Sequence, residues 1–190
     1  MARSELRISG FGGQGVVLSG QLIGRAAAIN AGMHATMIQS FGPEARGSAC
    51  SATLVISDEE ILYPYITHPD ILVAMSLEGY TMYRDELKDD GILIYEQDLV
   101  QPSFKPGQRA YGIPSTRFAE DLGRALVQNT VMVGFFTGVA GVVPAVAMRE
   151  VVRVSVPPGT VDLNMAAFER GLEHARHAAA TQEQSMEVTA

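Results

Sequence analysis

Three glycines near the start of the chain, Gly10, Gly12 and Gly15, have the spacing G-x-G-x-x-G, which restricts what this segment can form. A short apolar alternation at 6–8 precedes them, and small and apolar residues follow at helical spacing over 16–31. This order predicts a strand, a glycine loop and a helix, the context in which the spacing is meaningful. The loop lacks Cβ atoms and can approach a ligand closely, while the N–H groups that begin a helix favour a phosphate or a carboxylate. A tight turn without a ligand explains the same glycines, and both interpretations stay open at this point.

The rest of the chain alternates between extended apolar runs and segments with helical spacing. Further strands are predicted at 34–41, 48–56, 70–75, 92–95 and 110–113. Further helices are predicted at 77–88, 115–127, 129–140, 144–152 and 161–177, with Ser115 or Thr116 capping the second of them. This alternation predicts an α/β fold, a three-layer α/β/α Rossmann-like domain with a mostly parallel sheet in which some strands can be reversed. For 190 residues we expect one domain, over 1–180, and a frayed tail over 181–190.

Acidic residues outnumber basic ones in this chain. There are 14 Lys and Arg against 21 Asp and Glu, which gives a net charge of −7 at pH 7. Nucleic acids and anionic membranes both require a basic surface, so neither is expected as the main partner. Charges at Arg3, Glu5 and Arg7 occupy the place where a secretory signal would be apolar, and we therefore expect a cytoplasmic protein.

One uncharged segment, 130–148, is nearly long enough to span a membrane. It is interrupted by Gly134, Gly138, Gly141 and Pro144, so we interpret it as a buried helix that turns at the last two of these residues. The first two glycines, four residues apart, would bring a neighbouring backbone close, in this chain or in a partner.

Cys50 is the only cysteine in the sequence. A single cysteine excludes an internal disulfide and cannot supply the thiolates of a zinc or iron–sulfur site. It lies in a predicted strand with no histidine beside it, and we interpret it as a core residue rather than a nucleophile. We assign no catalytic residue and no metal ligand to this chain.

A second polar loop, at 39–48, follows the predicted second strand. In a parallel sheet it opens at the same edge as the glycine loop, so both would flank one crevice. Arg46 is the natural partner for an anion there, because a planar guanidinium suits a phosphate or a carboxylate, and an ordinary ion pair with Glu44 is the alternative. A dinucleotide would require an acidic residue at the end of the second strand, and none is present in Met37–Phe41, so NAD is disfavoured.

Taken together, these residues resemble the gamma component of the 2-oxoacid:ferredoxin (or flavodoxin) oxidoreductases, the pyruvate/ketoisovalerate oxidoreductase gamma family, in its 2-oxoglutarate type. Two motifs carry the resemblance: the glycine-rich opening at 10–15, and a loop usually written Ser-Tyr-Gly-Pro-Glu-x-Arg-Gly-Gly, which stands here at 40–48 with Phe41 for the tyrosine and Ser48 for the last glycine. Matching stretches at 69–74, 91–94, 129–134 and 163–164 extend the resemblance from about Leu6 to about Gly171.

The resemblance implies a subunit of an enzyme that oxidatively decarboxylates a 2-oxoacid on thiamine diphosphate, passes electrons through an iron–sulfur cluster to ferredoxin or flavodoxin, and releases an acyl-CoA. Thiamine diphosphate, magnesium and the cluster are expected on partner subunits, with coenzyme A as a substrate and no cofactor held by this chain alone. The gamma component is expected to pack over the thiamine-binding parts and to contribute to coenzyme A binding.

Eight residues are the candidates for ligand binding: Gly10, Gly12, Gly13, Gln14, Gly15, Glu44, Arg46 and Gly47. A subunit of an indolepyruvate oxidoreductase and a free-standing nucleotide-binding domain are kept as alternative functions, and a homodimer of the isolated chain is left open.

Overall fold

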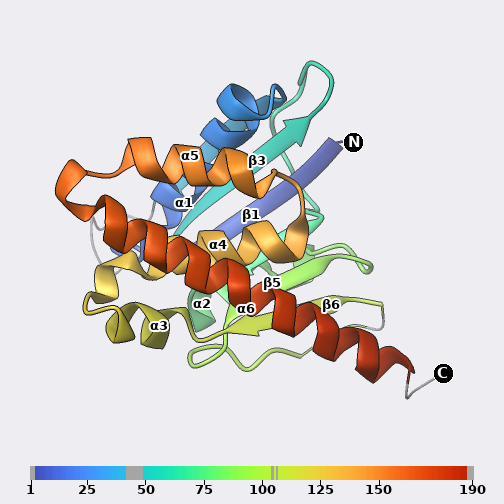
Figure 1. Cartoon of the computed structure of the whole chain (residues 1–190). Coiled ribbons are helices and arrows are strands. Elements are labelled where there is room, and N and C mark those ends of the chain that lie inside the picture. Colours follow the sequence, from blue (N-terminus) through green and yellow to red (C-terminus); the bar gives the residue numbers. More distant parts are fainter. Residues whose placement is uncertain (1–2, 42–48, 104, 106, 188–190) are drawn as a thin grey trace.

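The computed structural model describes residues 3–41, 49–103, 105 and 107–187 (Figure 1). Its strands are β1 (Arg3–Phe11), β2 (His34–Phe41), β3 (Ala49–Ser57), β4 (Ile71–Ala74), β5 (Ile92–Glu96) and β6 (Arg109–Ile113). Its α-helices are α1 (Val16–Arg25), α2 (Leu77–Tyr83), α3 (Ser115–Asp121), α4 (Gln128–Ala140), α5 (Ala145–Ser155) and α6 (Val161–Glu187). Short helical turns are η1 (Ala26–Asn30), η2 (Arg84–Glu86), η3 (Ala125–Val127) and η4 (Pro158–Thr160).

The strands form one six-stranded sheet in the order β2-β3-β1-β4-β5-β6. β1, β4, β5 and β6 are parallel to one another, whereas β3 lies between β1 and β2 and is antiparallel to both. Because only β3 is reversed, β2 points the same way as β1. The expected α/β architecture with a mostly parallel sheet is confirmed, and the reversed strand makes the sheet mixed.

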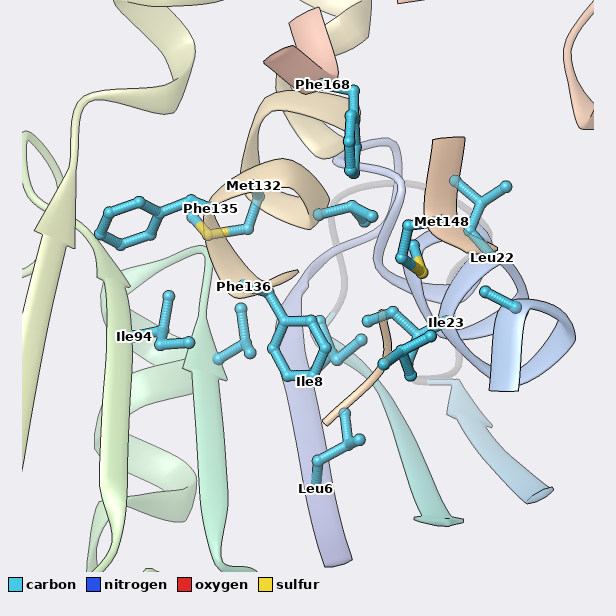
Figure 2. Packing of buried hydrophobic residues seen from close by; sticks show 14 of the residues in the cluster. Leu6, Ile8, Leu22, Ile23, Ile94, Met132, Phe135, Phe136, Met148 and Phe168 are labelled. Carbon is cyan, nitrogen blue, oxygen red and sulfur yellow. The ribbon is translucent and has the colours of Figure 1, made fainter. Parts of the chain in front are cut away.

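The larger core lies between the sheet and the helices α1, α4, α5 and α6 (Figure 2). Leu6 and Ile8 of β1 face this side and pack against apolar residues of α1 and α4, including Ile23 and Phe136. The other face of the sheet is covered by α2, and a smaller cluster around Leu72, Tyr80 and Leu93 fills that interface. The three layers are therefore unequal, with most of the apolar burial on the α1 side.

Helices α4 and α6 pack with their backbones in contact, and glycines make this possible. A Cβ on Gly134 of α4 would collide with the carbonyl oxygen of Phe168, and a Cβ on Gly171 of α6 would collide with the carbonyl oxygen of Val131. The sequence predicted a close backbone neighbour at Gly134, and that neighbour is α6 of the same chain. Helix α4 is buried over most of its length and ends at Gly141, whose φ is 62°, so the predicted buried helix with a turn is confirmed.

Two helix ends differ from the sequence-based expectation. The helix expected over 16–31 changes to a π-helical turn, η1, over its last residues, and the chain leaves it at Gly32, whose φ is 68°. Helix α6 was expected to end near His177, but its backbone stays helical to Glu187. No Gly or Pro follows Gly171, so the backbone has no residue that would stop the helix. In the part of the chain that the structure describes, no helix combines the length and the apolar character needed to cross a membrane.

Candidate functional site

The chain changes its direction of travel across the sheet between β1 and β4. From β1 it passes through α1 on one face toward β2 and β3, and from β4 it passes through α2 on the other face toward β5 and β6. In an open α/β sheet the loops diverge at such a switch point and leave a crevice outside the carboxyl ends of the strands, where ligands bind. The glycine loop after β1 lies at this edge, and this edge is the candidate site.

The glycines of the loop are required by backbone geometry at two positions and by packing at a third. Gly13 has a φ of 103° and Gly15 a φ of 77°, in the left-handed region that residues with a Cβ rarely adopt. Gly10 still belongs to β1, and a Cβ there would lie 2.6 Å from Oε1 of Gln14. Gly13 is exposed and Gly12 is half-buried, so the middle of the loop is accessible to a ligand.

Gln14 joins the ends of the two strands that flank the crevice. Its Oε1 accepts a hydrogen bond from the backbone N–H of Phe11 at 2.7 Å, and its Nε2 donates one to the carbonyl oxygen of Met75 at 2.9 Å. Phe11 is the last residue of β1, and Met75 directly follows β4. Both ends of the Gln14 amide therefore have partners within the fold, and we expect the residue to serve a ligand site by holding the shape of the loop.

The N-terminus of α1 begins in this loop and has no side-chain cap. Gly15 is the N-cap residue, and its carbonyl oxygen accepts from the N–H of Ser19 at 2.8 Å and from the hydroxyl of Ser19 at 3.0 Å. No acidic residue lies in the first turn of α1. The positive end of the helix is thus not compensated by a carboxylate of its own first turn, which favours an anionic ligand.

A buried amide beside the loop was not predicted from the sequence. Asn129, near the start of α4, is only 4% exposed, and its Nδ2 makes no hydrogen bond. Its side chain lies against Gly15, where a Cβ would approach both Cβ and Cγ of Asn129 to 2.7 Å. Position 15 therefore requires glycine for two reasons, the positive φ and the close contact with Asn129. In the sequence, Asn129 is only a polar residue that opens an apolar helix, which gave no reason to place it beside the glycine loop.

The predicted binding residues of the second loop lie outside the described residues: Glu44, Arg46 and Gly47. The strand end that precedes them is placed, because Phe41 of β2 and Gly10 of β1 both pair with Cys50 of β3. β2 therefore ends at the same edge of the sheet as the glycine loop, as expected from the sequence. The two strands share this edge through the antiparallel β3 between them, rather than as parallel neighbours.

A carboxylate is also buried at this edge, at the end of β5. Glu96 is 1% exposed and accepts hydrogen bonds from the hydroxyl of Ser115 and from both the N–H (3.0 Å) and the hydroxyl (3.3 Å) of Thr116. It thereby caps α3, for which the sequence predicted a cap from Ser115 or Thr116 themselves. Those hydroxyls donate to Glu96 instead, so the cap comes from a strand distant in sequence. These donors all bind Oε2, while Oε1 accepts a hydrogen bond from the N–H of Asp98 at 3.3 Å. Because both oxygens have partners within the fold, we interpret Glu96 as a structural group.

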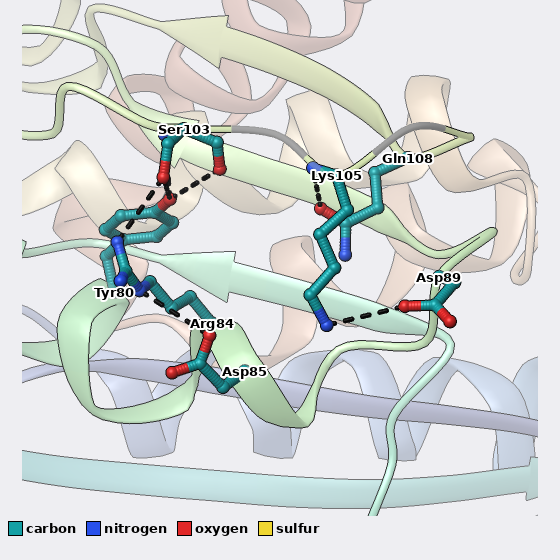
Figure 3. A network of polar contacts seen from close by, with 7 residues as sticks. All are labelled: Tyr80, Arg84, Asp85, Asp89, Ser103, Lys105 and Gln108. Carbon is teal, nitrogen blue, oxygen red and sulfur yellow. Dashed lines mark hydrogen bonds and ion pairs between the residues drawn. The ribbon is translucent and has the colours of Figure 1, made fainter.

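A second polar network lies on the α2 face of the sheet (Figure 3). The hydroxyl of Tyr80 donates to the carbonyl oxygen of Ser103 and accepts from its N–H, both at 2.9 Å. A guanidinium nitrogen of Arg84 is 3.3 Å from the Ser103 hydroxyl, and Nζ of Lys105 is 3.4 Å from Oδ1 of Asp89. These contacts border a cavity of about 100 Å³ and hold the segment after β5 against α2. Because both cations already have partners, we interpret this network as structural.

Cys50 is buried in β3, and burial raises the pKa of its thiol. A raised pKa leaves little thiolate at neutral pH, which agrees with its interpretation as a core residue. Among the described residues, no group of three or more His, Cys, Asp or Glu side chains is arranged to hold a metal ion.

Comparison with known proteins finds matches over most of this chain. The profile of the pyruvate ferredoxin/flavodoxin oxidoreductase family covers residues 5–174. The chain is 47% identical over 178 residues to the 2-oxoglutarate synthase subunit KorC of Methanothermobacter marburgensis, an alignment that spans 90% of this chain and 96% of that subunit. It is 35% identical over 177 residues to the ketoisovalerate oxidoreductase subunit VorA of Methanothermobacter thermautotrophicus, spanning 90% of this chain but 36% of that longer subunit.

The fold also agrees with a solved structure, the gamma subunit of a keto/oxoacid ferredoxin oxidoreductase from Geobacter sulfurreducens. The TM-score is 0.82 with 36% sequence identity, over 92% of this chain and 99% of that one. The resemblance inferred from the glycine-rich opening and the 40–48 motif is confirmed by both comparisons. The chain therefore belongs to the pyruvate ferredoxin/flavodoxin oxidoreductase family, and it is of the gamma-subunit type within that family.

Proposed function

We propose that this chain is the gamma subunit of an enzyme that oxidises 2-oxoglutarate to succinyl-CoA, with carbon dioxide released and two electrons passed to ferredoxin. The observation that carries the choice of substrate is the near full-length identity to the 2-oxoglutarate synthase subunit, which exceeds the identity to the ketoisovalerate relative. Thiamine diphosphate with magnesium and an iron–sulfur cluster, on partner subunits, would supply the decarboxylation and the electron transfer. The only cysteine of this chain is buried in β3 and does not fit a cluster site.

The contribution of this chain to that reaction would be to bind the phosphate groups of coenzyme A at the carboxyl edge of β1. The backbone of the half-buried Gly12 and the exposed Gly13, together with the N-terminus of α1, which has no side-chain cap, offers N–H donors for phosphate oxygens. Arg46, from the loop that begins at the same edge after Phe41, would add a charge-assisted contact. In this arrangement the same edge would face the thiamine-binding subunit, so that the thiol of coenzyme A reaches the acyl group formed there.

The substrate assignment is tested with the purified complex that contains this chain. Ferredoxin reduction is measured with 2-oxoglutarate, pyruvate, 2-oxoisovalerate and indolepyruvate, each in the presence of coenzyme A. The expected result is the highest kcat/KM with 2-oxoglutarate. A preference for indolepyruvate would instead establish the alternative function, and a complex that lacks thiamine-binding and cluster-bearing subunits would contradict the proposal as a whole.

The coenzyme A contact is tested with Arg46→Ala in the same complex. Loss of a charge-assisted hydrogen bond to phosphate is expected to raise the apparent KM for coenzyme A by roughly tenfold, with the KM for the 2-oxoacid unchanged. Arg109→Ala is the matched control, because Arg109 is exposed at the first residue of β6, at the opposite edge of the sheet. An unchanged KM for coenzyme A in Arg46→Ala would leave Arg46 without a role in binding.

A further inference from the structure

β2 is an edge strand, and no strand among the residues that the structure describes pairs with its outer side. It has eight residues, pairs only with β3, and contains neither a charged residue nor a proline. The opposite edge strand, β6, has five residues and begins with a charged one, Arg109. Soluble proteins normally protect a sheet edge with charges, prolines, bulges or a short length, because its free N–H and C=O groups can pair with another chain. β2 has none of these protections along His34–Phe41.

A groove runs alongside this edge, between β2 and the helix α1 with its continuation η1. Its volume is about 510 Å³, and its wall is formed by small and apolar residues with few polar ones: Gly20, Gln21, Gly24, Arg25, Ala28, Ile29, Ala35, Thr36 and Met37. Ile29 in the groove wall is 68% exposed, and Phe41 at the end of β2 is 65% exposed. An open strand edge and an apolar groove are thus adjacent, which is the arrangement that binds an extended peptide through its backbone and its alternate side chains.

The groove contains one charged residue, Arg25. It lies in the last turn of α1, is exposed, and makes no ion pair with any of the residues that the structure describes. A guanidinium in an apolar wall, without an ion-pair partner among the described residues, is complementary to a carboxylate of whatever occupies the groove.

We propose that the outer edge of β2 and this groove bind an extended segment of another subunit of the same enzyme. The segment adds a strand beside β2, directs apolar side chains at alternate positions into the groove, and carries an Asp or Glu that pairs with Arg25. A second copy of this chain fits the site less well. Neither β2 nor the groove wall contains an acidic residue to meet Arg25 of the other copy, and each copy carries a net charge of −7. The identity of the partner as a subunit rests on the proposed function.

The position of β2 relates the proposed subunit contact to the glycine loop. β2 ends at the edge of the sheet that carries the glycine loop, since Phe41 and Gly10 share the partner Cys50. A segment bound along β2 therefore runs toward the edge where coenzyme A is proposed to bind, and it would fix how that edge is presented to the partner.

The test compares backbone amide exchange in the full-length chain alone and in the reconstituted complex. Within 34–41, the alternate amides that point away from β3 are expected to exchange at least about tenfold more slowly in the complex, because an added strand hydrogen-bonds the outer edge. Two charge substitutions then probe the side chains: Ile29→Glu and Arg25→Glu are each expected to weaken assembly by roughly tenfold or more, measured as the Kd for the remaining subunits. Leu62→Glu is the matched control, because Leu62 is 86% exposed but lies outside the groove, between β3 and β4.

Three results would overturn the inference: unchanged exchange at 34–41 on assembly, normal assembly of Ile29→Glu while Leu62→Glu fails to assemble, or protection of 34–41 in a homodimer of the chain that persists in the complex. Activity separates this inference from the proposed function. A complex that turns over 2-oxoglutarate without protection of β2 refutes only the inference, whereas protection of β2 in a complex that acts on another 2-oxoacid refutes only the substrate assignment.

Discussion

The backbone contact between α4 and α6 makes a strong prediction about Gly134→Ala. In an ordinary helix this change stabilises the protein by up to about 1 kcal/mol, because alanine has the higher helix propensity. At Gly134 the new Cβ would collide with the carbonyl oxygen of Phe168 and lie 3.1 Å from the N of Leu172. Both of these atoms belong to backbone, which cannot swing aside as a flexible side chain does.

The size of the effect follows from these two opposing terms. Relief of the collision requires α6 to move away from α4, and Gly171, packed against the carbonyl of Val131, moves with it. Overpacking of this kind costs about 1–3 kcal/mol or more, and a rigid backbone neighbour places this site at the upper end. After subtraction of the propensity gain, we expect a loss of roughly 2 kcal/mol, which for a domain of this size lowers Tm by about 4–8 °C.

The assay is thermal and urea unfolding followed by circular dichroism, with Gly24→Ala as the matched control. A Cβ at Gly24 of α1 would meet only Leu54, with Cδ2 at an ordinary 3.4 Å, so this variant should be as stable as the parent or slightly more stable. The same substitution should thus lower stability in α4 and leave it unchanged or raise it slightly in α1. Equal stability of Gly134→Ala and Gly24→Ala would refute the reasoning.

Further predictions concern the crevice, a histidine and the cysteine. Gln14→Glu keeps the acceptor for Phe11 but places a carboxylate against the carbonyl of Met75. We therefore expect the free energy of unfolding in urea to fall by about 1–3 kcal/mol, and the KM for coenzyme A to rise at unchanged kcat. An unaltered KM would show that the glycine loop does not bind coenzyme A. Desolvation lowers the pKa of His174 below 6.5, so the fold prefers the neutral ring: stability is fully present above that pH and declines as the pH falls toward the folded-state pKa. His174→Gln should flatten this decline in urea midpoints, and an equally steep decline would contradict it. Buried Cys50 should react with a thiol reagent only as the chain unfolds, and rapid labelling of the native protein would show that β3 opens locally.

The elements of this fold were largely readable from the sequence, because period and length identify them locally. The direction of β3 was not read, although β2 and β3 are joined by too short a connection for a parallel crossover. The cap of α3 was unreadable in principle: Ser115 and Thr116 have the composition of a local cap, but their donors are directed by Glu96, which reaches α3 only through the folded sheet.

The candidate site shows the same division. Gly10 and Gly15 belong to the G-x-G-x-x-G spacing, and the structure explains both, Gly10 by packing and Gly15 by its positive φ. Gly13, which also has a positive φ, stands outside that spacing. The contact of Asn129 with the glycine loop was not predictable from the sequence, because it arises only where the fold brings α4 against Gly15. A single polar residue at the start of a helix does not indicate which residue it will contact. The groove beside β2 depends likewise on strand order, which no local pattern in His34–Phe41 records.

The reversed strand β3 also constrains the order in which the chain can fold. β2 and β3 are neighbours in sequence and pair along their whole length, so their hairpin closes a small loop and can form early. β1 can pair with β3 only once this hairpin has formed, and it can pair with β4 only after the chain has passed through β2 and β3. The strands β4, β5 and β6 then add in turn, each across a longer loop. The antiparallel hairpin of β2 and β3, which also forms the open edge of the sheet, is thus expected to nucleate folding. Folding φ-values near zero for substitutions in β3 would exclude that order.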